Sequence, residues 1–210
     1  MNLPNRLTIL RLFLVPVFII FTVIDNVWTR IFALIIFIAA SLTDLYDGYF
    51  ARKYGEVTVF GEFMDPLADK FLISAAFICF VGMRELHVPA WMVVLIIGRE
   101  FIITGLRLVA ASKGVVIPAD RTGKFKTTSQ IIAIIVILLI LCINSIVNYF
   151  YNIEPHLFFE KPGHPEWVGS ILMWSSYWLT FITTLLTLIS GNTYLRKNWH
   201  LFSQEIGSKT

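Results

Sequence analysis

Residues 31–52 read IFALIIFIAASLTDLYDGYFAR, an apolar half followed by a half that carries two aspartates and an arginine. An apolar helix of about 20 residues is long enough to cross the hydrocarbon core of a bilayer. Residues 61–82 have the opposite order, because Asp65 and Asp69 come first and a mainly apolar run follows. The two segments therefore predict a pair of membrane helices whose charged ends meet near one membrane surface.

The composition of the whole chain favours a membrane protein. Of the 210 residues, 57% are hydrophobic and 15% are charged, and the mean hydropathy is +0.74, whereas soluble domains are about 25% charged. Cys79 and Cys142 lie in apolar runs and the four histidines lack zinc spacing, so neither a disulfide framework nor a zinc site is expected. The net charge is only +3, and no nucleic-acid partner is expected.

Hydrophobic periodicity predicts an all-α integral membrane protein with six transmembrane helices. A single domain is expected over residues 1–210, with an N-terminal juxtamembrane segment. The predicted spans are residues 7–24, 31–52, 61–82, 91–111, 127–147 and 168–189. Arg11 interrupts the first apolar run and no small-residue cleavage site follows it, so this helix is expected to be retained.

Lysine and arginine outside the spans or near their ends predict the orientation of the chain. Eleven of these residues fall on the side of the two termini, and Arg30, Arg84 and Lys161 fall on the other side. Because cytoplasmic loops carry the excess of positive charge, both termini are expected in the cytoplasm. The charged halves of the second and third helices are then expected at the cytoplasmic face.

Four aspartates lie in those charged halves, although a carboxylate within a span costs about 2.5–3.5 kcal/mol on insertion scales. At 100° per residue, Asp44 and Asp47 share one arc of their helix, and Asp65 and Asp69 form one stripe on the next. Facing carboxylates repel unless they are protonated or bridged by cations. An all-oxygen ligand set selects hard ions, so the pattern predicts two Mg²⁺ or Mn²⁺ ions, a known arrangement for phosphoryl transfer.

The pattern from Asp44 to Asp69 resembles the signature of the CDP-alcohol phosphotransferase family. It reads DLYDGYFAR at 44–52 and, eight residues later, GEFMDPLAD at 61–69. The resemblance implies a six-helical, commonly homodimeric membrane enzyme that depends on Mg²⁺ or Mn²⁺. It implies one metal ion on Asp44, Asp47 and Asp65 and a second on Asp44, Asp65 and Asp69, with Asp69 also the base. The donor-binding residues that it implies are Asn5, Thr8, Gly48, Arg52, Thr58 and Gly61.

Two further stretches resemble bacterial members of the family that act on CDP-diacylglycerol and sn-glycerol 3-phosphate. They are NLPNRLTILR at 2–11, and GREFIITGLR at 98–107 followed by GKFKTTSQ at 123–130. The resemblance fades after residue 135. It implies an enzyme of the bacterial cell membrane whose active site faces the cytoplasm and whose products are phosphatidylglycerol phosphate and CMP.

Cationic residues agree with a phosphorylated acceptor. Arg99 and Arg107 lie 80° apart on one side of the fourth helix, and Lys124 and Lys126 enter the fifth from the cytoplasmic side. These four residues are expected to bind the acceptor phosphate. Two alternatives stay open: Arg99 pairs with Glu100 or an aspartate, and the two lysines only anchor the helix at the membrane surface.

Two other functions also stay open. The same chemistry could use inositol phosphate, serine or a phosphatidyl group as the acceptor. A divalent-cation transporter would also carry intramembrane carboxylates along its ion path. Arg52 beside the carboxylates counts against a transporter.

Overall fold

The computed structural model describes residues 3–54, 59–83, 85–112, 121–151 and 166–206. Within these ranges, side chains are described for residues 9–43, 68, 70–83, 85–111, 123, 125–150 and 174–198. The described chain is all-α, as predicted, and each predicted span corresponds to one helix. The helices are α1 (Leu3–Val23), α2 (Val27–Tyr54), α3 (Val59–Val81), α4 (Ala90–Ser112), α5 (Arg121–Tyr151) and α7 (Glu166–Ile206).

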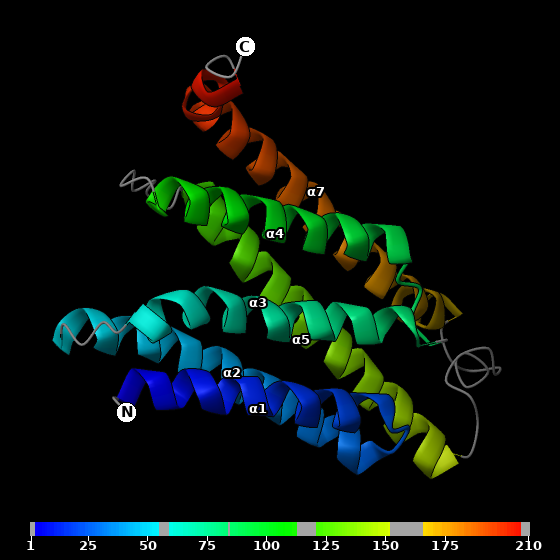
Figure 1. Cartoon of the computed structure of the whole chain (residues 1–210). Coiled ribbons are helices and arrows are strands. Elements are labelled where there is room, and N and C mark those ends of the chain that lie inside the picture. The colour runs from blue at the N-terminus through cyan, green and yellow to red at the C-terminus, as the bar shows by residue number, and fades with distance from the viewer. Residues whose placement is uncertain (1–2, 55–58, 84, 113–120, 152–165, 207–210) are drawn as a thin grey trace.

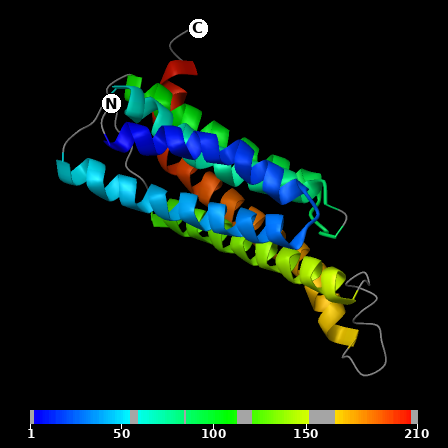
Figure 2. The ribbon, with the colours of Figure 1, turned by 90° about the horizontal axis from the view of Figure 1, so that it is seen from below.

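The helices form a bundle in which successive elements run in opposite directions. Figure 1 shows the α1–α2 and α3–α4 turns at one end, and the N-terminus with the ends of α2 and α4 at the other. In the same view α5 and α7 cross the remaining helices obliquely. α1 packs against α2 and α3, α5 packs against α2, α3 and α7, and α7 also packs against α4. Figure 2 shows α5 alongside α2 from a second direction.

The last helix is longer than its predicted span, because it continues from residue 189 to Ile206. Hydropathy falls at Ser190, so the predicted span ends just before this residue. Ser190, Gly191 and Tyr194 are nevertheless buried. Packing against the bundle therefore extends beyond the apolar part of α7, and it brings polar residues of the tail towards α4.

Aromatic and branched side chains fill the core between α1, α2, α3 and α5. Phe18, Phe37, Phe77 and Phe80 are fully buried, and the ring centroids of Phe18 and Phe37 are 5.7 Å apart. In a bilayer, helices associate through close packing rather than through the transfer of apolar groups out of water. These interlocking rings therefore fix how α1, α2 and α3 pack together.

The outer surface is also apolar, which is unusual for a protein surrounded by water. Phe13, Val94, Phe150 and Ile189 are each more than 60% exposed. Among the described residues, the helical segment Phe125–Phe150 is both long and apolar enough to cross a membrane. Shorter apolar helical segments are Ile9–Val23, Val27–Thr43 and Lys70–Val81.

A row of small hydroxyl side chains covers the face of α7 that packs on α4 and α5. Ser176, Thr180, Thr183, Thr184, Thr187 and Ser190 are all buried. The hydroxyls of Thr180, Thr183 and Thr184 donate to carbonyl oxygens four residues earlier in the same helix. Small residues at such an interface allow the helix backbones to approach closely. We refer to these six residues as the hydroxyl seam.

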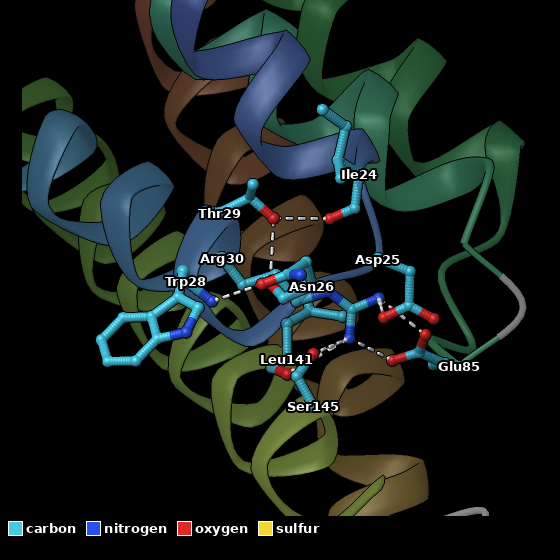
Figure 3. Close-up of polar contacts among 9 residues, drawn as sticks. All are labelled: Ile24, Asp25, Asn26, Trp28, Thr29, Arg30, Glu85, Leu141 and Ser145. Atoms are coloured by element: carbon cyan, nitrogen blue, oxygen red, sulfur yellow. Dashed lines mark hydrogen bonds and ion pairs between the residues drawn. The ribbon is translucent and has the colours of Figure 1, made fainter. Parts of the chain in front are cut away.

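An arginine joins three elements at the end of the bundle that holds the α1–α2 turn. Arg30 on α2 is 4% exposed and donates to both carboxylate oxygens of Glu85, at 2.8 and 2.7 Å. It also donates to the Ser145 hydroxyl on α5 at 2.7 Å and lies 3.0 Å from Asp25 (Figure 3). Asn26 begins α2 nearby by accepting a hydrogen bond from the Trp28 amide at 2.9 Å. We call Asp25, Arg30, Glu85 and Ser145 the arginine clamp.

Candidate active site

The two acidic motifs lie on helices, as predicted. Asp44, Asp47, Gly48 and Arg52 belong to the C-terminal part of α2, and Gly61, Asp65 and Asp69 to the N-terminal part of α3. The side chains of these residues are outside the described set, and so is Thr58 as a whole. Asn5 and Thr8 belong to the start of α1 and Lys124 to the start of α5, again without described side chains.

Described neighbours of the aspartates converge on one cavity that has both polar and apolar lining residues. Ser41, one turn before Asp44 on α2, and Lys70, next to Asp69 on α3, both line a cavity of about 120 Å³. α1, α4 and α5 complete its wall. Its polar lining residues are Arg11, Ser41, Lys70, Ser74, Glu100, Thr127 and Gln130. The helix segments next to the two acidic motifs therefore border the same cavity.

Glu100 on α4 is the centre of a buried network at this cavity. Its carboxylate forms an ion pair with the Lys126 ammonium on α5, and the Gln130 amide donates to the same oxygen at 3.2 Å. Glu100, Lys126 and Gln130 are 7, 4 and 1% exposed. The Gln130 amide also donates to the Thr187 hydroxyl of the hydroxyl seam at 3.4 Å. The network therefore connects α4, α5 and α7.

Arg99 leaves α4 next to Glu100 and crosses to α7. Its Nη1 is 3.7 Å from the Glu100 carboxylate, and its Nη2 donates to the Ser190 hydroxyl at 3.0 Å. The side chain passes so close to Gly191 that a Cβ there would lie 3.0 Å from Arg99 Cγ. The pairing of Arg99 with Glu100, which the sequence left open, is confirmed.

Two of the four predicted acceptor cations thus meet at one carboxylate. Lys126 is buried and paired, so the alternative in which it only anchors α5 at the membrane surface is wrong. Burial in low dielectric favours a partner for each charge, and Glu100 supplies it. Arg107 lies two turns beyond Arg99 on α4 and interacts electrostatically with it. The role of Lys124 in binding the acceptor phosphate stays a prediction, because its side chain is outside the described set.

Sequence reasoning missed several residues at this site. No role was predicted for Gln130, although it belongs to the motif at 123–130, and Ser190, Gly191 and Tyr194 lie beyond the last predicted span. A signal for α7 was present, because hydroxyl residues recur at positions 176, 180, 183, 187 and 190. This three-to-four-residue spacing places them on one face of a helix.

The chemistry of the acidic motifs fits divalent metal ions. Among residues with described side chains, no group of three or more His, Cys, Asp or Glu could hold a metal ion. The four motif aspartates lie outside that set. They are carried by two helices that border the same cavity, and carboxylate oxygens are the ligands that Mg²⁺ and Mn²⁺ prefer.

Comparison with known proteins identifies the class to which this fold and site belong. The family model described as CDP-alcohol phosphatidyltransferase matches residues 1–188. The chain therefore belongs to the CDP-alcohol phosphatidyltransferase family, whose members are membrane-bound.

Curated relatives match over nearly the whole chain. A CDP-diacylglycerol–glycerol-3-phosphate 3-phosphatidyltransferase of Bacillus subtilis (strain 168) is 40% identical over 210 residues, covering 94% of this chain and 95% of that protein. One of Rickettsia typhi with the same description is 36% identical over 195 residues, covering 93% of this chain and 96% of that protein. A third relative with this description, from Cereibacter sphaeroides, is 31% identical over 211 residues, covering 93% of this chain and 95% of that protein.

Proposed function

We propose that this protein transfers the phosphatidyl group of CDP-diacylglycerol to sn-glycerol 3-phosphate and releases CMP. The observation that carries the proposal is the 40% identity to a relative with this activity in its description, over 94% of the chain. The buried cations Arg99 and Lys126, beside a cavity next to the acidic motifs, support an acceptor that carries a phosphate. A cation path is disfavoured because Arg11 and Lys70 line the same cavity.

The donor and the metal ions are assigned to the motif residues of α2 and α3. Asp44, Asp47 and Asp65 would hold one Mg²⁺ or Mn²⁺ ion, and Asp44, Asp65 and Asp69 the second. When bound, such ions neutralise the charge of a diphosphate and make its phosphorus more electrophilic. Gly48, Arg52, Thr58 and Gly61, with Asn5 and Thr8 on α1, would bind the cytidine diphosphate part of the donor.

Asp69 is the residue that we assign as the general base. Its carboxylate takes the proton of the acceptor 1-hydroxyl as that oxygen forms a bond to the phosphorus that carries diacylglycerol. The bond from this phosphorus to the CMP oxygen breaks, and CMP leaves with the electron pair. The motifs contain no serine, cysteine or histidine suited to covalent catalysis, so one direct transfer is the simplest sequence.

Arg99, Arg107, Lys124 and Lys126 are assigned to the acceptor phosphate. Arg99 is held by Glu100 and Ser190, which fixes the guanidinium before the substrate arrives. A planar guanidinium offers two parallel donors to phosphate oxygens. Preorganised donors avoid the cost of ordering long side chains when the ligand binds.

The chain is proposed to be one domain with six spans in a bacterial cell membrane, both termini and the active site facing the cytoplasm. Cysteine labelling of Glu160→Cys and Glu205→Cys, each in a background without Cys79 and Cys142, tests this topology. Residue 160 should react from outside intact cells, and residue 205 only after permeabilisation. Reaction of both from the same side would contradict it. The proposed homodimer is tested by the mass of the protein in detergent micelles.

The activity is tested by offering purified protein CDP-diacylglycerol and a panel of alcohols with Mg²⁺ or Mn²⁺. The panel contains glycerol 3-phosphate, inositol phosphate, serine and phosphatidylglycerol, and both CMP and the lipid product are measured. We expect CMP release and phosphatidylglycerol phosphate with glycerol 3-phosphate only. Preference for another alcohol would overturn the assignment of glycerol 3-phosphate as the acceptor. Absence of CMP with every alcohol would overturn the proposed transferase activity.

A further inference from the structure

Tyr194 on α7 holds a buried hydroxyl with no hydrogen-bond partner among the residues that the structure describes. The residue is only 7% exposed. A buried hydroxyl without a partner costs about 1–3 kcal/mol, and buried tyrosines usually find one. The fold therefore holds a hydrogen-bond donor in place at a point where the described protein gives it nothing to bind.

The position of Tyr194 on α7 brings it next to Arg99. Ser190 precedes it by four residues and Gly191 by three, so the three residues share one face of the helix. Ser190 accepts a hydrogen bond from Arg99, and Gly191 lacks the Cβ that would press on the Arg99 side chain. The Arg99 guanidinium therefore lies against the turn of α7 that leads into Tyr194.

The surroundings of this hydroxyl are positively charged. It interacts electrostatically with the guanidinium groups of Arg99 and Arg107. Arg99 Nε is also buried without a hydrogen-bond partner among the described residues. The nearby carboxylate of Glu100 is already bound by Lys126 and Gln130. The Tyr194 hydroxyl and Arg99 Nε are therefore two unused donors, and together with the charge of Arg99 and Arg107 they suit an anion with several acceptor oxygens.

We propose that the Tyr194 hydroxyl donates a hydrogen bond to the phosphate of the acceptor alcohol, which Arg99 and Arg107 bind by charge. This assignment rests on the proposed function and adds a residue that selects acceptors with a phosphate monoester. A site built to hydrogen-bond a group rejects an analogue without that group, because its buried donors then stay unpaired. Glycerol would leave Tyr194 and Arg99 Nε without a partner, so it should be a poor acceptor.

The donor diphosphate is the other source of phosphate oxygens in this reaction. Steady-state kinetics of Tyr194→Phe separates the two, since the substitution removes only the hydroxyl. If Tyr194 binds the acceptor, KM for glycerol 3-phosphate should rise about tenfold or more in this variant, because a hydrogen bond to a charged group is lost. KM for CDP-diacylglycerol should stay within about twofold. An unchanged KM for glycerol 3-phosphate, or an equal rise in both constants, overturns the assignment.

Tyr177→Phe is the matched control on the same helix. Tyr177 stacks on Phe181 with ring centroids 6.2 Å apart, and at 1.5 Å per residue it lies about 25 Å from Tyr194 along α7. This variant should keep both KM values. A second measurement is the melting temperature with and without glycerol 3-phosphate. Tyr194→Phe should melt no lower than wild type without ligand, because no bond is lost, and should gain less from the ligand.

The two proposals fail in different ways. If wild type releases no CMP with glycerol 3-phosphate, the proposed function fails, while the increase in melting temperature with this ligand still tests Tyr194. If wild type is active and Tyr194→Phe shows the same KM and the same ligand-induced increase, only the Tyr194 assignment fails. A lower melting temperature of Tyr194→Phe without ligand would show a structural role and would also overturn it.

Discussion

The Glu100 carboxylate on α4 pairs with the Lys126 ammonium on α5, and both side chains are almost completely removed from solvent. The pair joins the two helices that supply the proposed acceptor cations. Gln130 donates to the same carboxylate oxygen, and Arg99 lies 3.7 Å from it. One acid therefore positions three donors from α4 and α5.

Glu100→Gln should destabilise the protein by about 3–5 kcal/mol, because it leaves the Lys126 charge buried without compensation. Unfolding by denaturant in detergent micelles measures the change. The double variant Glu100→Gln, Lys126→Met should lose less stability than the sum of the two single variants. Purely additive losses would mean that the ion pair contributes no coupling energy.

Asp69→Asn should abolish turnover and leave donor binding within about tenfold of wild type. The amide cannot accept the hydroxyl proton, and loss of a general base costs about 10²–10⁴-fold in rate. CMP release and equilibrium binding of a CDP-diacylglycerol analogue, both with Mg²⁺, measure the two effects. Asp25→Asn, at the other end of the bundle and 60% exposed in its side chain, should retain activity. Loss of donor binding in Asp69→Asn would make this residue chiefly a metal ligand.

Gly191→Ala should raise KM for glycerol 3-phosphate several-fold, because the added Cβ displaces Arg99 from its path across α7. Gly105→Ala is the control, since nothing described lies within 4 Å of a Cβ at that position. The control should be as active as wild type and more stable by up to about 1 kcal/mol, the difference in helix propensity. Equal kinetic effects in both variants would contradict the role of Gly191.

Arg30→Met should lower stability by about 1–3 kcal/mol, since the hydrogen bonds of the arginine clamp to Glu85 and Ser145 are lost. Both KM values should stay near wild type, because the clamp lies at the end of the bundle away from the acidic motifs. Arg30→Lys keeps the charge but cannot donate two parallel hydrogen bonds to Glu85. Its stability should therefore lie between those of wild type and Arg30→Met. A selective rise in one KM would connect the clamp to the active site.

The sequence was sufficient to predict the helices. Apolar runs, their lengths and the two acidic motifs indicated six helices in the right places, because periodicity and hydropathy report local structure directly. Glu100 was considered as a partner of Arg99, and the structure confirms that pairing. Its ion pair with Lys126, 26 residues away, depends on how α4 and α5 pack, which no local pattern encodes.

The contribution of α7 to the site could not be predicted. The predicted span ended where hydropathy falls at Ser190, but burial of Ser190 and Tyr194 comes from contact with α4 rather than from local composition. The need for a glycine at position 191 becomes apparent only from the structure, in which the Arg99 side chain passes over this residue. The hydroxyl spacing is typical of a packed helix face, but it does not indicate which helix packs on that face.

The hydroxyl seam has a mechanical consequence for α7. Few directional bonds join this face to α4 and α5, because the hydroxyls of Thr180, Thr183 and Thr184 donate to carbonyl oxygens of α7 itself. The bonds described across it are Arg99 to Ser190, Gln130 to Thr187 and, near the start of the seam, the His87 amide to the Ser176 hydroxyl. Two of these bonds lie beside the proposed acceptor site, and the third lies beside the α3–α4 turn at the other end of the bundle. We therefore expect α7 to keep its register, because directional bonds hold it near both ends of the seam while close packing alone joins the part between them.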